Sequence, residues 1–201
     1  MGDVIMLLER LAERQSSIGA SRSAFFFDLA CPFSYLTAER VERALGDVDW
    51  VPCSLRSPVR EPSRQTIARA ERQAFALQLP LVWPDVFPSG VPAAQRAASY
   101  AAEMGAGARF ALAASRLAFC GGYDLEDPEI LSDAAEAAGV PVGECLVAAG
   151  DNARDARLEA TARRLASCGV PRLPAIRIGR RWLWGEQMLS EARPLLRNAA
   201  S

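Results

Sequence analysis

Hydrophobic positions form short, dense runs near the two ends of the chain and follow helical spacing between them. The first run, residues 24–29, contains three consecutive phenylalanines, and residues 48–55 form a second run. Runs of this length predict buried strands. Residues 33–45, between the two, carry an apolar stripe at helical spacing, and Gly46 follows as a natural helix end. Strand, helix and strand in this order predict a βαβ unit with parallel strands.

Most of the remaining chain is expected to be helical. Helical patterns cover residues 63–79 and 152–168, and the alanine-rich residues 91–149 contain no strand signal. This middle part is therefore predicted to be an all-helical block. At the N-terminus, residues 4–11 also have apolar side chains at helical spacing, and a Ser- and Gly-rich linker follows over residues 15–23.

Strand character returns near the C-terminus. Residues 174–178 alternate in polarity, and a turn at Gly179-Arg180 leads into residues 182–184. Two short runs around a glycine-containing turn predict a β-hairpin. A final helix is expected over residues 186–197.

The amino-acid composition excludes several kinds of catalytic and binding site. A chain of 201 residues suits one domain, or one domain with a large insertion, and its net charge of −1 provides no basic surface for nucleic acid or an anionic membrane. It contains neither lysine nor histidine. The absence of histidine rules out Ser-His-Asp and Cys-His catalysis, histidine metal sites and an imidazole base within one chain. The absence of lysine rules out Schiff-base chemistry.

The five cysteines are Cys31, Cys53, Cys120, Cys145 and Cys168, and no pair is spaced Cys-x-x-Cys. This spacing predicts neither a zinc site nor a dithiol redox pair. The apolar run near the N-terminus is too short and too charged for a signal peptide, and no stretch is long enough to cross a membrane. We therefore expect a cytoplasmic protein with reduced thiols. Except for Cys31, the cysteines lie in apolar contexts typical of packing residues.

The strongest chemical candidate is Cys31, because it precedes Pro32 at the start of the helix predicted after the first strand. The positive end of a helix dipole stabilises a thiolate, so the pKa of Cys31 is expected below the free value of ~8.5. Cys31 is accordingly predicted to be the most reactive of the five thiols under mildly acidic conditions. Ser34 faces the same turn and could donate its hydroxyl to the sulfur. The alternative is a buried cysteine that acts as a small hydrophobic residue.

Three features resemble the thioredoxin fold: the order of the elements, the Cys-Pro pair at the first helix, and Leu173-Pro174 before the third strand. The helical insertion resembles the DsbA-like branch of that fold. Within that branch, the chain is most similar to 2-hydroxychromene-2-carboxylate isomerases and kappa-class glutathione transferases. Four stretches carry the resemblance: residues 26–36, 79–88, 169–174 and 184–189. The implied class is an α/β thioredoxin-like fold with a large all-helical insertion. The implied domains are an N-terminal helix and linker (1–23), a thioredoxin-like domain (24–62 and 151–201) and a helical insertion (63–150).

The resemblance also implies a set of site residues. The catalytic serine of the isomerase family falls on Cys31, and Ser34 occupies the position of the second cysteine of related oxidoreductases. The aspartate that anchors glutathione in kappa-class enzymes falls on Gln187. Cofactor-binding positions are Pro32, Phe33, Leu173, Pro174, Gly185, Glu186 and Gln187. Substrate-pocket positions are Trp83, Phe87, Arg172 and Trp184.

Two of these positions have a specific expected role. The Leu173–Pro174 bond is expected to be cis, which leaves the backbone of Leu173 available to pair with an extended thiol substrate. Arg172 could bind a carboxylate of substrate or cofactor. Trp184 is favoured as a pocket residue, whereas Trp83 and Trp182 suit the core equally well.

Three functions remain open on the sequence. The first is an isomerase or transferase that acts on a small aromatic or conjugated substrate with glutathione or another low-molecular-weight thiol, and without metal. The second is a thiol–disulfide oxidoreductase that uses Cys31 alone. The third is a non-catalytic binding module. Related enzymes are commonly dimers, so a homodimer is one oligomeric state that the resemblance allows.

Overall fold

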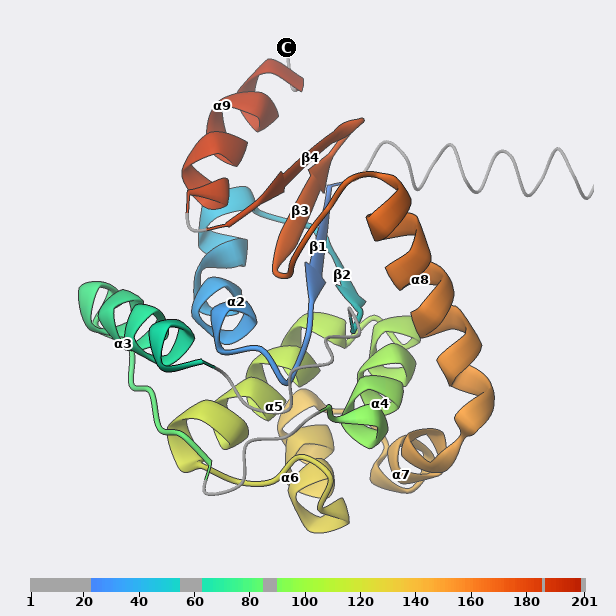
Figure 1. Cartoon of the computed structure of the whole chain (residues 1–201). Coiled ribbons are helices and arrows are strands. Elements are labelled where there is room, and N and C mark those ends of the chain that lie inside the picture. The colour runs from blue at the N-terminus through green and yellow to red at the C-terminus, as the bar shows by residue number, and fades with distance from the viewer. Residues whose placement is uncertain (1–22, 55–62, 85–89, 186, 200–201) are drawn as a thin grey trace, which may run out of the picture.

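The computed structural model describes residues 23–54, 63–84, 90–185 and 187–199. A four-stranded sheet in the order β2-β1-β3-β4 forms the centre of the fold (Figure 1). β1 and β2 are parallel, and the β1–β3 and β3–β4 pairs are antiparallel. The expected βαβ unit and C-terminal hairpin are therefore confirmed. The strands are β1 (Ala24–Phe27), β2 (Asp49–Pro52), β3 (Ala175–Ile178) and β4 (Arg181–Trp184).

Strand β1 is apolar throughout because both of its faces are buried. Phe25 and Phe27 point to the larger core, while Ala24 and Phe26 point to a smaller core on the opposite face. Side chains alternate between the two faces of a strand, so the uninterrupted run reflects a strand inside the sheet and covered on both sides.

Helices cover both faces of the sheet. α2 (Pro32–Leu45) and α9 (Met188–Ala199) lie together on one face, while α8 (Asp155–Ser167) runs along the other after a short 3-10 turn, η1 (Asn152–Arg154) (Figure 1). Leu165 of α8 belongs to the smaller core. Both faces of β1 are thereby shielded from water.

Helices alone make up the middle of the chain. Residues 91–149 contain no strand, as predicted, and alanines on the inner faces of the helices allow close packing; Ala94, Ala97, Ala98 and Ala101 are fully buried. This block packs against the end of the sheet from which α2 starts (Figure 1). Its helices are α4 (Pro92–Glu103), α5 (Gly107–Gly121), α6 (Pro128–Ala138) and α7 (Val142–Gly150).

Helix α3 (Arg64–Leu77) is attached differently, because it lies on the outer side of α2 and packs against that helix (Figure 1). The Ser63 hydroxyl accepts the Thr66 N–H at its start. Only Ala70 and Ala74 are buried along its length, and Phe75 is 86% exposed. None of the described helices is long and apolar enough to span a bilayer.

Two of the observed elements differ from their predicted boundaries by about two residues. The first strand ends at Phe27 instead of residue 29, because the Asp28 carboxylate accepts the Ala30 N–H at 2.9 Å and turns the chain. The last helix begins at Met188 instead of residue 186. The helix expected over residues 4–11 and its linker lie almost wholly outside the described residues, apart from Ser23.

Candidate functional site

Cys31 lies at the N-cap of α2, directly after the turn that follows β1. Its carbonyl accepts the N–H groups of Ser34 and Tyr35, so the first helical turn begins at this residue. Its Sγ lies 3.9 Å from the carbonyl oxygen of Leu173, and the Leu173–Pro174 bond is cis, as expected. The first turn of α2 contains no acidic residue. The structure thus places the thiol between a helix start and the loop before β3.

The thiol of Cys31 is nevertheless not acidic, and this corrects the sequence-based expectation. Burial and the nearby Asp28 carboxylate raise the pKa of Cys31 from 9.0 to about 11. The N–H groups at the start of α2 and the Ser34 hydroxyl lower this pKa, but their effect is smaller. Cys31 is therefore a neutral S–H group under physiological conditions.

Asp28 is a half-buried acid next to the thiol, and the sequence-based reasoning did not select it. Its Oδ1 accepts hydrogen bonds from the Ala30 N–H and from Gln95 Nε2, each at 2.9 Å, and Ser54 provides another. Burial raises the pKa of Asp28 despite these bonds. The only available signal was an aspartate directly after an apolar strand. Gln95 belongs to α4, so the helical block contributes to the environment of the thiol.

Ser34 lies in the first turn of α2 and contacts the Cys31 sulfur. Its Oγ accepts the backbone N–H of Asp28 at 3.1 Å, which leaves the hydroxyl hydrogen available for another acceptor. This hydroxyl bonds to Cys31 and lowers the pKa of the thiol. Ser34 therefore lies where the sequence predicted, within reach of the sulfur.

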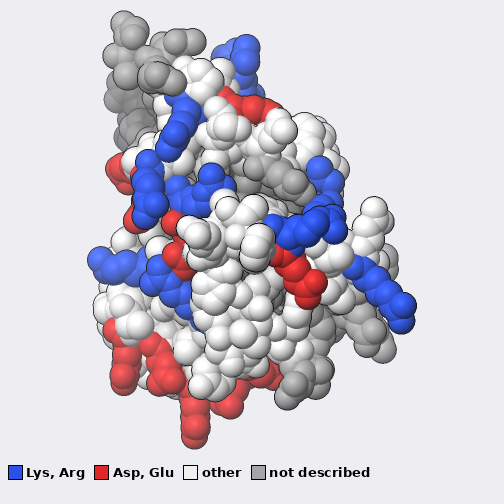
Figure 2. All heavy atoms as spheres, turned by 90° about the vertical axis from the view of Figure 1, so that its left-hand side faces the viewer, with Lys and Arg blue, Asp and Glu red and all other residues white. Residues whose placement is uncertain are grey.

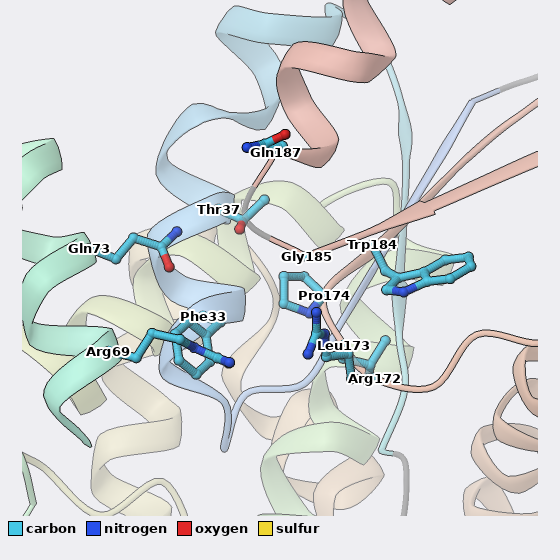
Figure 3. A pocket seen from close by; sticks show the side chains of 10 residues that line it. All are labelled: Phe33, Thr37, Arg69, Gln73, Arg172, Leu173, Pro174, Trp184, Gly185 and Gln187. Carbon is cyan, nitrogen blue, oxygen red and sulfur yellow. The ribbon is translucent and has the colours of Figure 1, made fainter. Parts of the chain in front are cut away.

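A pocket of about 320 Å³ opens beside Leu173, between α2, α3 and the loops that flank the C-terminal hairpin (Figure 3). It brings together seven of the predicted positions and three residues of α2 and α3 that were not predicted. The predicted positions are Phe33, Arg172, Leu173, Pro174, Trp184, Gly185 and Gln187. The others are Thr37, Arg69 and Gln73. Nothing in the pattern of α3 distinguished Arg69 or Gln73 from solvent-facing residues.

Residues 24–196 match the family described as DSBA-like thioredoxin domain. The chain belongs to this family. It has a thioredoxin-like α/β fold with a helical insertion, as the sequence predicted.

Solved structures agree with this assignment. A 2-hydroxychromene-2-carboxylate isomerase is 16% identical with a TM-score of 0.73, over 89% of this chain and 95% of the other. A protein of Streptomyces coelicolor described as a probable DsbA oxidoreductase is 22% identical with a TM-score of 0.74, over 89% of each chain. The cytosolic disulfide reductase DsbM of Pseudomonas aeruginosa, solved with GSH, is 18% identical with a TM-score of 0.68, over 89% of this chain and 98% of the other. None of the curated protein sequences matches significantly.

Other predicted site residues of this DsbA-like protein lie elsewhere. Trp83 does not line the pocket, and its indole Nε1 donates to Glu71 at 3.1 Å. Trp182 is half-buried against the smaller core, where its ring centre lies 5.1 Å from that of Phe26. Pro32 is buried in the first turn of α2. Phe87 and Glu186 lie outside the described residues.

None of the five cysteines is among the residues that line the pocket; Cys31 lies next to it, because its Sγ is 3.9 Å from the carbonyl oxygen of Leu173. Cys53 and Cys145 are buried, as expected of packing residues, and burial raises their pKa values to about 12 and about 11. Cys120 Sγ lies 3.2 Å from the hydroxyl oxygen of Tyr35. Cys168 is exposed, so its assignment as a packing residue was wrong; α8 ends at Ser167 and leaves it at the surface. The described Cys, Asp and Glu residues form no cluster that could hold a metal ion.

Gly185 should tolerate a side chain poorly because of its backbone conformation. Its φ is +92°, and an added Cβ would lie 3.4 Å from Nη2 of Arg172. We expect Gly185→Ala to lower the free energy of unfolding by about 1–2 kcal/mol, because this positive φ is strained for a residue with a side chain. Urea denaturation measures this effect. The matched control is Gly179→Ala, with φ +57° and open space around its Cβ, which should be destabilised without any change in the pocket. A Gly185→Ala variant as stable to urea as the parent protein would contradict this expectation.

Proposed function

We propose that this protein is a thiol-dependent isomerase or transferase that acts on a small aromatic or conjugated substrate together with a low-molecular-weight thiol. The observation that carries the proposal is the position of the Cys31 thiol at the N-cap of α2, 3.9 Å from the carbonyl oxygen of Leu173 and next to a pocket; burial and the Asp28 carboxylate, which raise its pKa, favour its protonated form. A protonated S–H group donates a hydrogen bond, as the serine hydroxyl at this position in the isomerase family would. Cys31 therefore acts as the hydrogen-bond donor that activates a bound thiol.

The residues around Cys31 suit a thiol ligand that has a peptide backbone, such as glutathione. Leu173 lies beside the sulfur, and no hydrogen bond within the described chain uses its N–H. This N–H is available to a backbone carbonyl of the ligand. Gln187 lines the same pocket and offers a further donor and acceptor.

A bound low-molecular-weight thiol would supply a nucleophilic sulfur for addition to an electron-poor carbon. Cys31 would turn its S–H group from the Leu173 carbonyl toward the ligand sulfur, where negative charge collects, while the Ser34 hydroxyl bonds to Cys31 and the positive end of α2 acts in the same direction. Together they would hold the ligand sulfur as a thiolate. Cys31 itself would not need to lose its proton.

A second candidate is thiol–disulfide exchange with Cys31 as the nucleophile. The approach of Cys31 Sγ to the Leu173 backbone favours it, because an extended disulfide substrate could pair with that backbone. Ser34 occupies the second position of the motif and cannot resolve a mixed disulfide, so another thiol must release it. The structural similarity to a disulfide reductase solved with GSH makes glutathione the first thiol to try, and a cytoplasmic location would suit either activity.

One experiment tests both functions. The purified protein is incubated with glutathione and a panel of electron-poor aromatic or conjugated compounds, and separately with glutathione and an aromatic disulfide. Thiol-dependent isomerisation or conjugation supports the first function, and disulfide reduction without it supports the second. Failure of every reaction, with tight binding of the same compounds, would establish a binding module instead.

A further inference from the structure

Gln95 of the helical block reaches the acid beside Cys31. It lies in the first turn of α4 and is only 2% exposed. Its Nε2 donates to Asp28 Oδ1 at 2.9 Å. The backbone N–H of Asp28 donates to Ser34 Oγ at 3.1 Å, and the Ser34 hydroxyl bonds to Cys31. A series of hydrogen bonds therefore connects the helical block with the thiol.

One polar atom of the buried Gln95 amide lacks a partner. Its Oε1 is buried and accepts no hydrogen bond from the described residues. A buried acceptor without a partner is unfavourable. The bond from Nε2 to the Asp28 carboxylate is charge-assisted, and such bonds are about twice as strong as neutral ones. We conclude that the contact with Asp28 is the interaction that keeps the amide in this position.

The charge of Asp28 acts on the thiols around it. It raises the pKa values of Cys31 and of Cys53, which follows β2. The groups that donate hydrogen bonds to the carboxylate are neutral: the Ala30 N–H, the Gln95 amide and the Ser54 side chain. On the face shown in Figure 2, acidic side chains gather mainly along the lower edge, where water and salt screen their charges. The half-buried Asp28 is screened less, so its protonation state alters the electric field at the sulfur.

We propose that Gln95 is a positioning residue that holds the Asp28 carboxylate in its charged form and thereby preserves the S–H group of Cys31 as a hydrogen-bond donor. This inference deepens the proposed function and rests on it for its place in the reaction. An amide N–H stabilises a carboxylate more than a carboxylic acid, so Gln95 offsets part of the effect of burial on Asp28. A charged Asp28 disfavours a thiolate beside it. The helical block thus controls how tightly Cys31 holds its proton.

The test measures how the rate of Cys31 modification by methyl methanethiosulfonate, a small uncharged reagent, depends on pH. The Cys31 thiolate attacks the sulfenyl sulfur, the S–S bond breaks, and methanesulfinate leaves with the electron pair. The thiol proton passes to the buffer. Peptide mass spectrometry follows Cys31 separately from the other cysteines between about pH 4 and about pH 9, where the rate is proportional to the thiolate fraction.

In the parent protein, the logarithm of the rate should rise with pH and show an inflection where Asp28 titrates. Below the inflection Asp28 is neutral, so the rate should lie about three- to tenfold above the line extrapolated from higher pH. Gln95→Met keeps the length of the side chain but removes the hydrogen bond, and it should move the inflection up by about one pH unit. Ser99→Ala is the matched control, because it removes a buried hydroxyl one turn later on α4 and should leave the inflection unchanged.

An unchanged inflection in Gln95→Met would overturn the inference. An equal shift in Ser99→Ala would also overturn it, because it would indicate a general loosening of the helical block. A double variant checks the route: the inflection should be absent from Asp28→Asn, and Gln95→Met should have no further effect in that background. An additional effect there would show that Gln95 acts without Asp28, against the inference.

The parent protein keeps the inference testable if Gln95→Met fails to fold. Its profile is compared with that of Asp28→Asn, and equal profiles for the two would overturn the coupling between Asp28 and Cys31. These measurements need neither a substrate nor a cofactor. A failure of the proposed function, with the expected shift in Gln95→Met, would therefore be distinguished from a failure of the role of Gln95.

Discussion

Cys31→Ser should retain isomerase or transferase activity to within about tenfold, while disulfide exchange falls by more than about a thousandfold. The physical reason is that serine preserves a hydrogen-bond donor at the start of α2 but removes the sulfur. A donor that activates a bound thiol can be a hydroxyl, since its role is to stabilise charge on another atom. A nucleophile that forms a mixed disulfide must itself be a sulfur.

The measurement uses the glutathione-dependent reactions described above, with the two activities assayed on the same preparations. Cys168→Ser is the matched control, because it removes an exposed thiol far along the chain from the motif and should leave both activities intact. Cys31→Ala completes the series by removing the donor as well. Loss of isomerisation in Cys31→Ser, with retained folding, would show that the Cys31 sulfur itself performs the chemistry.

Alkylation of Cys31 should accelerate about tenfold for each pH unit from about pH 7 to about pH 10 and level off only above about pH 11. This follows from a thiol whose pKa burial and the Asp28 carboxylate raise to about 11. Iodoacetamide labelling followed by peptide mass spectrometry measures the rate for each cysteine separately. Exposed Cys168, in the same sample, should be labelled first at neutral pH.

Asp28→Asn tests the cause of the slow labelling, because it removes the charge while keeping an acceptor for the Ala30 N–H. We expect the variant to label Cys31 about three- to tenfold faster at neutral pH. An alkylation rate of Cys31 that levels off near neutral pH in the parent protein would contradict the raised pKa. It would support the lowered pKa predicted from the position of Cys31 at a helix start.

The same raised pKa affects stability with a definite sign. The folded protein holds the Cys31 proton more tightly than the unfolded chain, whose thiol has the ordinary pKa of 9.0. Cys53 and Cys145 act in the same direction. The stabilisation is fully present below about pH 9 and is lost as pH rises through about 11. Urea denaturation from pH 8 upward should show this decline, and Cys145→Ala should make it shallower.

The sequence by itself determined the architecture around the site, because the relevant signals are local. Three phenylalanines before Asp28 specify a strand buried on both faces, and Pro32 suits the first helical position after Cys31. Alanine-rich helical spacing specifies the middle block. Leu173-Pro174 before the third strand marked the loop that meets the thiol. Each signal depends on residues that are close together in the sequence, so it can be recognised without knowledge of the fold.

Only the tertiary structure decided the chemistry of Cys31. The helix start lowers the pKa of the thiol, but burial and the Asp28 charge raise it more, and burial depends on Gln95 and Leu173 from distant parts of the chain. The same holds for Arg69, which reaches the pocket because α3 packs against α2. Electric fields and solvent exclusion act through space, whereas the sequence pattern records only what is adjacent along the chain.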